Sequence, residues 1–188
     1  MSAVLESHGQ QAEIGDDRFY ETVDGQRVEK TPMGIPQNLV CTALSFYLQL
    51  YVRQQDIGTV ASETLFRLDQ ARGLERRPDL AFVSRQRWKR PTQTGAWDVV
   101  PDLAVEVISP TNRAPEVLEK VHQYFASGVR LVWVVYCEPR QVYVYRSPKT
   151  IKVLTPHDTL EGDDVIAGFT LPVAKLFEDL DQVESSDS

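Results

Sequence analysis

Two carboxylates stand inside apolar segments of the sequence, where charged side chains are rare. Glu106 lies in the middle of the run 102–109, and Asp79 lies near the start of the run 78–83. Both runs are short and apolar, which predicts β-strands. A buried carboxylate is costly unless it is paired with a cation or bound to a metal. If the strands are neighbours, the two carboxylates converge and suit Mg²⁺, which prefers few carboxylates and several waters. The alternative is that each carboxylate pairs with an arginine such as Arg77.

Asp102 lies on the same predicted strand as Glu106 and needs separate treatment. Side chains alternate between the two faces of a strand, so Asp102, Ala104, Glu106 and Ile108 share one face. At about 3.3 Å per residue, the two carboxylates are about 13 Å apart along the strand. They cannot both bind one ion, so Asp102 is a weaker site candidate and fits better as a residue at the start of the strand.

Lys120 lies in the next predicted element along the chain after this strand. The run 115–126 predicts a helix, with Pro115 in its first turn and Gly128 after its end. Val117, Leu118, Val121, Tyr124 and Phe125 form its apolar stripe. Lys120 lies at the edge of that stripe. Its ammonium therefore either lies against the sheet or points to solvent.

The remaining elements indicate a mixed sheet with helices packed on it. Asp24-Gly25 predicts a hairpin within 18–30. Apolar periodicity predicts a helix over 37–55 and a small one over 173–177. Further strands are expected at 59–61, 65–68, 131–136, 141–146, 151–154 and 169–171. This order is not a regular alternation of strand and helix, so we expect the α/β class in its α+β, mixed-sheet form.

Length and composition limit which classes of protein and which kinds of site are possible. The 188 residues fit a single domain over 1–188, ordered from about 18 to 178, with an acidic tail at each end. Cys41 and Cys137 form no metal-binding or redox motif. No apolar run is long enough to span a membrane, and the start of the chain lacks the pattern of a secretory signal. We therefore expect no membrane partner and a cytoplasmic location.

The net charge of −7 hides a basic segment at 67–90, which holds eight basic residues against three acidic ones. Such a surface is compatible with binding a phosphate backbone, and Arg76, Arg77, Arg85 and Arg87 are the candidates for nucleic-acid contacts. The alternative is a solvated, charged loop.

Three stretches carry a resemblance to a known family. They are Arg77-Pro78-Asp79 with the apolar residues after it, the run from Pro101 to Pro110 around Glu106, and Glu119-Lys120 with Tyr124 and the run 132–135. Together with 20–29 and 168–177, they resemble the Uma-type endonuclease family of the PD-(D/E)XK superfamily. The resemblance spans roughly residues 18–178 and implies a restriction endonuclease-like core with flanking helices and an N-terminal β-hairpin.

The resemblance also implies roles for single residues. Asp79 matches the first aspartate of the motif, and Glu106 matches its second acidic position. The motif lysine would stand at position 108, where this chain has isoleucine, so Lys120 is the candidate for a lysine supplied from the helix instead. Glu29 matches a position that is often acidic in the family and is a second weaker site candidate.

The implied activity is hydrolysis of phosphodiester bonds in DNA, with Mg²⁺ or Mn²⁺ held by Asp79 and Glu106, in a protein that pairs as a homodimer. Two alternatives stay open. Ile108 at the position of the motif lysine fits a nucleic-acid-binding module that lacks turnover. The net acidity fits a structural or oligomerisation protein. An ammonium of Lys120 close to both carboxylates would favour the enzyme.

Overall fold

The centre of the computed structural model, which describes residues 19–91 and 95–185, is a six-stranded sheet in the order β10-β9-β8-β7-β6-β3. Strands β7 and β8 are parallel, and the other neighbouring pairs are antiparallel. The strands are β3 (Gly58–Ser62), β6 (Leu80–Ser84), β7 (Leu103–Ile108), β8 (Leu131–Tyr136), β9 (Gln141–Ser147) and β10 (Thr150–Leu154). Helix α2 (Ala114–Ala126) connects β7 to β8, as a parallel pair requires.

Two smaller sheets flank the central one. A four-stranded sheet in the order β2-β1-β5-β4 consists of β1 (Tyr20–Val23), β2 (Gln26–Glu29), β4 (Phe66–Asp69) and β5 (Leu74–Arg76). The expected hairpin joins β1 to β2, and Asp24 and Gly25 both have positive φ there, at 50° and 76°. This is the left-handed geometry that such two-residue turns require. The second sheet pairs β11 (Thr159–Glu161) with β12 (Thr170–Pro172).

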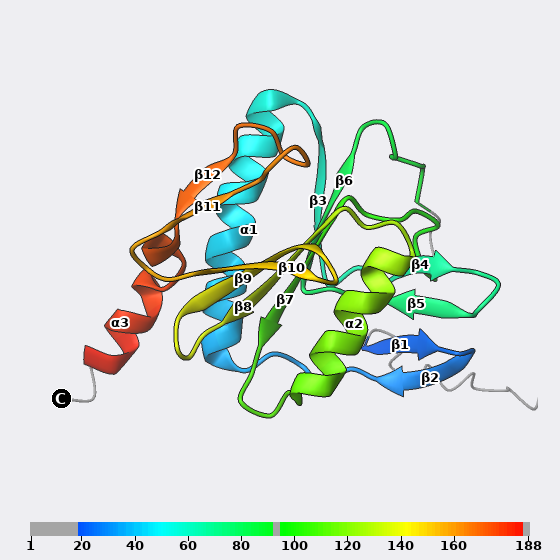
Figure 1. Ribbon diagram of the computed structural model, residues 1–188, viewed down its shortest axis with the longest axis horizontal. Helices are drawn as coiled ribbons and strands as arrows, with labels where there is room; N and C mark the ends of the chain where they lie inside the picture. Colours follow the sequence, from blue (N-terminus) through cyan, green and yellow to red (C-terminus); the bar gives the residue numbers. More distant parts are fainter. Residues whose placement is uncertain (1–18, 92–94, 186–188) are drawn as a thin grey trace, which may run out of the picture.

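The helices cover both faces of the central sheet (Figure 1). Helix α1 (Ile35–Gln55) lies on one face with β11, β12 and the C-terminal elements, while α2 and the four-stranded sheet lie on the other. Strand β7 divides its side chains between the two layers. Leu103, Val105 and Val107 belong to the core beside α1, and Ala104 and Ile108 belong to the core beside α2. The predicted alternation along this strand is confirmed, and it leaves Glu106 on the α2 face.

The mixed-sheet class is confirmed, while three local expectations need correction. The segment 173–177 forms a 3-10 turn, η1 (Val173–Leu176), followed by helix α3 (Glu178–Ser185) where we expected the ordered part to end. Leu176, Phe177 and Leu180 are buried against α1, and this packing stabilises a segment whose acidic composition suggested a tail. Strands β5 and β11, of three residues each, were not predicted. The N-terminal tail lies outside the described residues.

Within the described ranges, no helix combines the length and the apolar character needed to cross a membrane.

Candidate active site

Asp79 and Glu106 meet at the end of the β6–β7 ladder. The pairing of these antiparallel strands ends at Leu80 and Val105, and each carboxylate stands one residue beyond that pair. The N–H of Asp79 donates to the Val105 carbonyl at 3.0 Å. Oδ2 of Asp79 accepts the N–H of Val107 at 2.6 Å, which ties the side chain across to β7. Both carboxylates are almost fully buried, at 3% and 4% exposure, yet both line a cavity of about 610 Å³.

Glu106 is held by two side chains of helix α2. Nζ of Lys120 donates to Oε2 at 3.0 Å, and the hydroxyl of Tyr124 donates to Oε1 at 2.6 Å. Burial raises the pKa of Glu106 above its ordinary value, against the opposing effect of Lys120. Burial and the Glu106 charge raise the pKa of Tyr124 well above its usual value, so its hydroxyl remains a hydrogen-bond donor. The structure therefore brings Lys120 from the helix into the site, next to the second carboxylate.

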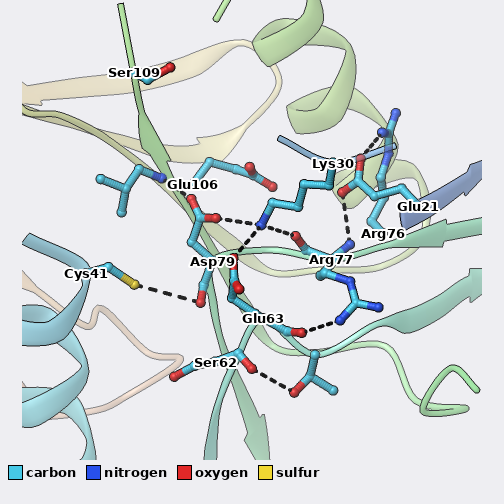
Figure 2. A network of polar contacts seen from close by, with 12 residues as sticks. Glu21, Lys30, Cys41, Ser62, Glu63, Arg76, Arg77, Asp79, Glu106 and Ser109 are labelled. Atoms are coloured by element: carbon cyan, nitrogen blue, oxygen red, sulfur yellow. Dashed lines mark hydrogen bonds and ion pairs between the residues drawn. The ribbon is translucent and has the colours of Figure 1, made fainter. Parts of the chain in front are cut away.

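Asp79 has a lysine partner of its own, Lys30, at the end of the N-terminal hairpin (Figure 2). Nζ of Lys30 donates to Oδ1 of Asp79 at 2.6 Å, to the carbonyl of Arg77 at 3.0 Å and to Oε1 of Glu63 at 3.3 Å. The backbone N–H of Lys30 donates to the Phe19 carbonyl at 2.8 Å, which fixes the point where the side chain leaves β2. Burial alone would lower the pKa of Lys30, but the carboxylates around it raise it above its usual value.

A buried ion pair between Glu21 of β1 and Arg76 of β5 supports the floor of the site. Nη1 of Arg76 lies 2.6 Å from Oε2 of Glu21, and its Nε donates to Oε1 of Gln123 at 2.7 Å. Glu21 also accepts the N–H of Arg77 at 3.0 Å and lies 3.4 Å from Nζ of Lys120. Burial alone would raise the pKa of Glu21, but Lys120 and Arg76 hold it below the ordinary value. This ion pair links the four-stranded sheet to helix α2, through Gln123 and Lys120.

Asp102, the first weaker candidate, directly precedes β7, four residues before Glu106. Its side chain is 2% exposed and accepts the N–H of Ser84 at 2.8 Å. Arg87 lies 3.1 Å from its Oδ1, and Arg130 lies 3.7 Å from the same atom. These contacts tie the start of β7 to the end of β6 and to the segment before β8. Glu29, the second weaker candidate, is exposed on β2 and lines the mouth of the cavity.

The four arginines proposed for nucleic-acid contacts lie in two regions, two before strand β6 and two after it. Arg76 is 6% exposed and committed to Glu21, while Arg77 donates from Nη1 to the Glu63 carbonyl at 2.7 Å. Arg85 and Arg87 follow the far end of β6, six and eight residues after Asp79 along the chain. Arg85 pairs with Asp56 on the surface. The contacts of these four residues with nucleic acid stay a prediction.

Cys41 of helix α1 is a buried thiol next to the backbone of Asp79. Its Sγ contacts the carbonyl of Asp79 at 3.9 Å. Burial and the nearby Asp79 charge raise the pKa of the Cys41 thiol to about 12. A thiol is a weak nucleophile unless it loses its proton. Cys41 therefore packs against the site and does not supply a thiolate near neutral pH.

The donor set of the site fits a hard divalent cation with few protein ligands. Within residues 19–91 and 95–185, no group of three or more metal-binding side chains is present. Asp79 and Glu106 supply two carboxylates at one cavity, which is the number that Mg²⁺ commonly uses beside its waters. The N–H of Val107 points to Asp79, and a strand residue presents its carbonyl on the same edge as its N–H. Val107 also lines this cavity, so we expect its carbonyl to be a third oxygen available to a cation.

Comparison with known proteins identifies the family and the fold. The family model of Uma2, described as "Putative restriction endonuclease", matches residues 5–174. The chain belongs to the Uma2 family. A crystal structure from Anabaena variabilis ATCC 29413, described as "a putative nuclease belonging to DUF820", is similar with a TM-score of 0.73 at 17% identity, covering 85% of this chain and 89% of that one. No curated protein matches. The Uma2 resemblance and the restriction endonuclease-like fold are thereby confirmed.

Sequence reasoning brought Asp79, Glu106 and Lys120 together but missed Lys30 and Glu21. Lys30 stands 49 residues before Asp79, at the end of a polar hairpin, and no spacing rule connects the two. The role of Tyr124 had a visible signal. It lies four residues after Lys120, so both side chains project from one face of helix α2, and a buried tyrosine hydroxyl needs a polar partner.

Proposed function

We propose that this chain is a metal-dependent endonuclease that hydrolyses phosphodiester bonds of DNA. One observation carries the proposal: Asp79, Glu106 and Lys120 line a single cavity, with Nζ of Lys120 3.0 Å from Glu106. Two buried carboxylates and one ammonium are the groups that phosphodiester hydrolysis uses to hold a metal and to balance the charge of the reacting phosphate. Membership of the Uma2 family supports the same reaction class.

Asp79 and Glu106 would hold Mg²⁺ or Mn²⁺, with the Val107 carbonyl beside them. When bound, the ion supplies Lewis acidity and lowers the pKa of a coordinated water. The side chains around the ion orient the carboxylates and balance the charge of the phosphate. Tyr124 fixes one oxygen of Glu106 and so sets the orientation of its carboxylate. Lys120 is half-buried at the cavity, where its positive charge stabilises the negative charge that develops on the phosphate during attack.

Contacts with the DNA backbone are assigned to the basic residues outside the cavity. Arg85 and Arg87 lie at the other end of β6, and a strand of five residues spans about 17 Å. Successive phosphates of one DNA strand are about 3.4 Å apart along the axis, so these arginines suit a phosphate several nucleotides from the cleaved bond. Homodimer formation and a cytoplasmic location stay predictions from the sequence.

The experiment that tests the proposal is nicking of supercoiled plasmid by the purified chain with Mg²⁺, with Mn²⁺ and with EDTA. The control is a variant that carries both Asp79→Asn and Glu106→Gln, which keeps the size of each side chain. We expect nicking only by the wild type and only with metal. Equal nicking by both proteins, or nicking in EDTA, would refute the site. DNA binding without nicking under either metal would favour the binding module.

The lysine supplied from the helix gives a further prediction. Lys120→Met is expected to lower the nicking rate by about 10²-fold, because removing one group that stabilises transition-state charge typically has an effect of that order. The matched control is Lys149→Met, which removes an exposed lysine from the turn between β9 and β10. The measurement is the initial rate at saturating Mg²⁺. A rate within twofold of the wild type would exclude Lys120 from the chemistry.

A further inference from the structure

Lys30 fills a cation site that the chain itself builds. Its three oxygen partners belong to Asp79, Glu63 and the Arg77 backbone, at 2.6, 3.3 and 3.0 Å. A lysine ammonium has three N–H donors and no acceptor, so these partners use all of its donors. The Lys30 side chain is 10% exposed. The ammonium is therefore enclosed by oxygens in the way that a bound cation is, and it does not behave as a surface charge.

A divalent cation at Asp79 would meet this ammonium directly. Oδ1 of Asp79 already accepts from Lys30, and Oδ2 already accepts the N–H of Val107. Two positive charges a few ångströms apart repel strongly where water is largely excluded. The ammonium can move away from Asp79, because its other two acceptors, Glu63 and the Arg77 carbonyl, remain within its reach. Glu63 is 28% exposed, so this retreat leads toward solvent.

We propose that Lys30 is a built-in competitor of the metal: it neutralises Asp79 in the metal-free protein and withdraws onto Glu63 and the Arg77 carbonyl when a divalent cation binds. This inference rests on the proposed function, because it takes Asp79 as a metal ligand. It gives Lys30 two effects of opposite sign. The residue stabilises the metal-free fold, since Asp79 would otherwise be a buried charge without its cation, and it weakens metal binding.

The test is direct titration of the metal-free full chain with Mn²⁺ in a calorimeter, together with thermal unfolding in EDTA. Lys30→Met is expected to lower the Kd for Mn²⁺ about tenfold or more, because it removes the competing charge. The same variant is expected to have a lower midpoint of unfolding in EDTA. Lys149→Met is the matched control, and it should change neither quantity. A purely structural lysine would lower the midpoint without tightening Mn²⁺ binding.

A second variant keeps the inference testable if Lys30→Met does not fold. Glu63→Gln removes the partly exposed carboxylate onto which Lys30 withdraws, so the ammonium stays on Asp79 and Mn²⁺ is expected to bind about tenfold more weakly. If the wild type binds Mn²⁺ and neither variant shifts the Kd in its expected direction, the role of Lys30 is wrong and the proposed function stands. If no form of the protein binds Mn²⁺, both are wrong.

Discussion

Glu106→Gln is expected to lower the rate of metal-dependent DNA nicking by about 10³-fold or more, since it removes a charged ligand from the proposed metal site. Tyr124 and Lys120 donate to different oxygens of Glu106, at 2.6 and 3.0 Å. Glutamine keeps the shape of the side chain but has only one oxygen, so it loses the negative charge and one of these two acceptors. The measurement is the single-turnover rate of plasmid nicking, read beside circular dichroism to show that the variant folds.

Asp102→Asn is the matched control for this experiment. Asp102 and Glu106 are both almost fully buried, at 2% and 4% exposure; Asp102 directly precedes β7, and Glu106 lies within it. Asp102 makes its contacts with Ser84, Arg87 and Arg130, none of which lines the cavity. Its replacement is therefore expected to reduce stability and, because Arg87 is proposed to contact the DNA backbone, to lower the nicking rate of the folded protein by much less than Glu106→Gln does. Equal loss of nicking in both variants would mean that the loss reflects damage to β7 and not to a metal site.

The positions of the two carboxylates could be predicted because strand periodicity is local. One charged residue inside an apolar strand is visible in the sequence, and the period of two gives its face without any knowledge of the neighbours. The structure adds which strands lie side by side. The pair Leu80 and Val105 sets Asp79 beside Glu106, and this register follows from the packing of the whole sheet.

The partners of the carboxylates could be predicted only where they lie on a regular element close in sequence. Lys120 was proposed because it lies at the edge of the apolar stripe of the predicted helix 115–126 and because Ile108 occupies the position of the motif lysine. Lys30 was not found, because it approaches Asp79 through the β1–β2 hairpin, and its place depends on how the four-stranded sheet docks on the central one. A polar hairpin that shows the same alternation could dock in many ways. Contacts between separate sheets therefore could not be predicted from the sequence alone.

The contact between the four-stranded sheet and the rest of the protein also carries the largest expected effect on stability. Arg76→Leu is expected to lower the free energy of unfolding by about 3–5 kcal/mol, because it removes the nearer of the two cations beside the buried Glu21 charge and leaves only Lys120, at 3.4 Å. Arg76 and Glu21 side chains are 7% and 5% exposed, so solvent screens neither partner well. The variant also leaves Gln123 without the donor at 2.7 Å. The measurement is urea unfolding in EDTA, followed by tryptophan fluorescence.

Two comparisons show whether burial causes the effect. Arg85→Leu breaks the exposed pair with Asp56 and is expected to cost less than about 1 kcal/mol, as surface pairs usually do. Replacing Glu21 and Arg76 together by leucine is expected to recover part of the loss, because no unpaired charge is then buried. Lys120 would still lose one of its two carboxylate partners, Glu21 at 3.4 Å. Restored stability with slower nicking would then separate the two roles of Glu21: holding Arg76 in the fold and holding Lys120 at the site.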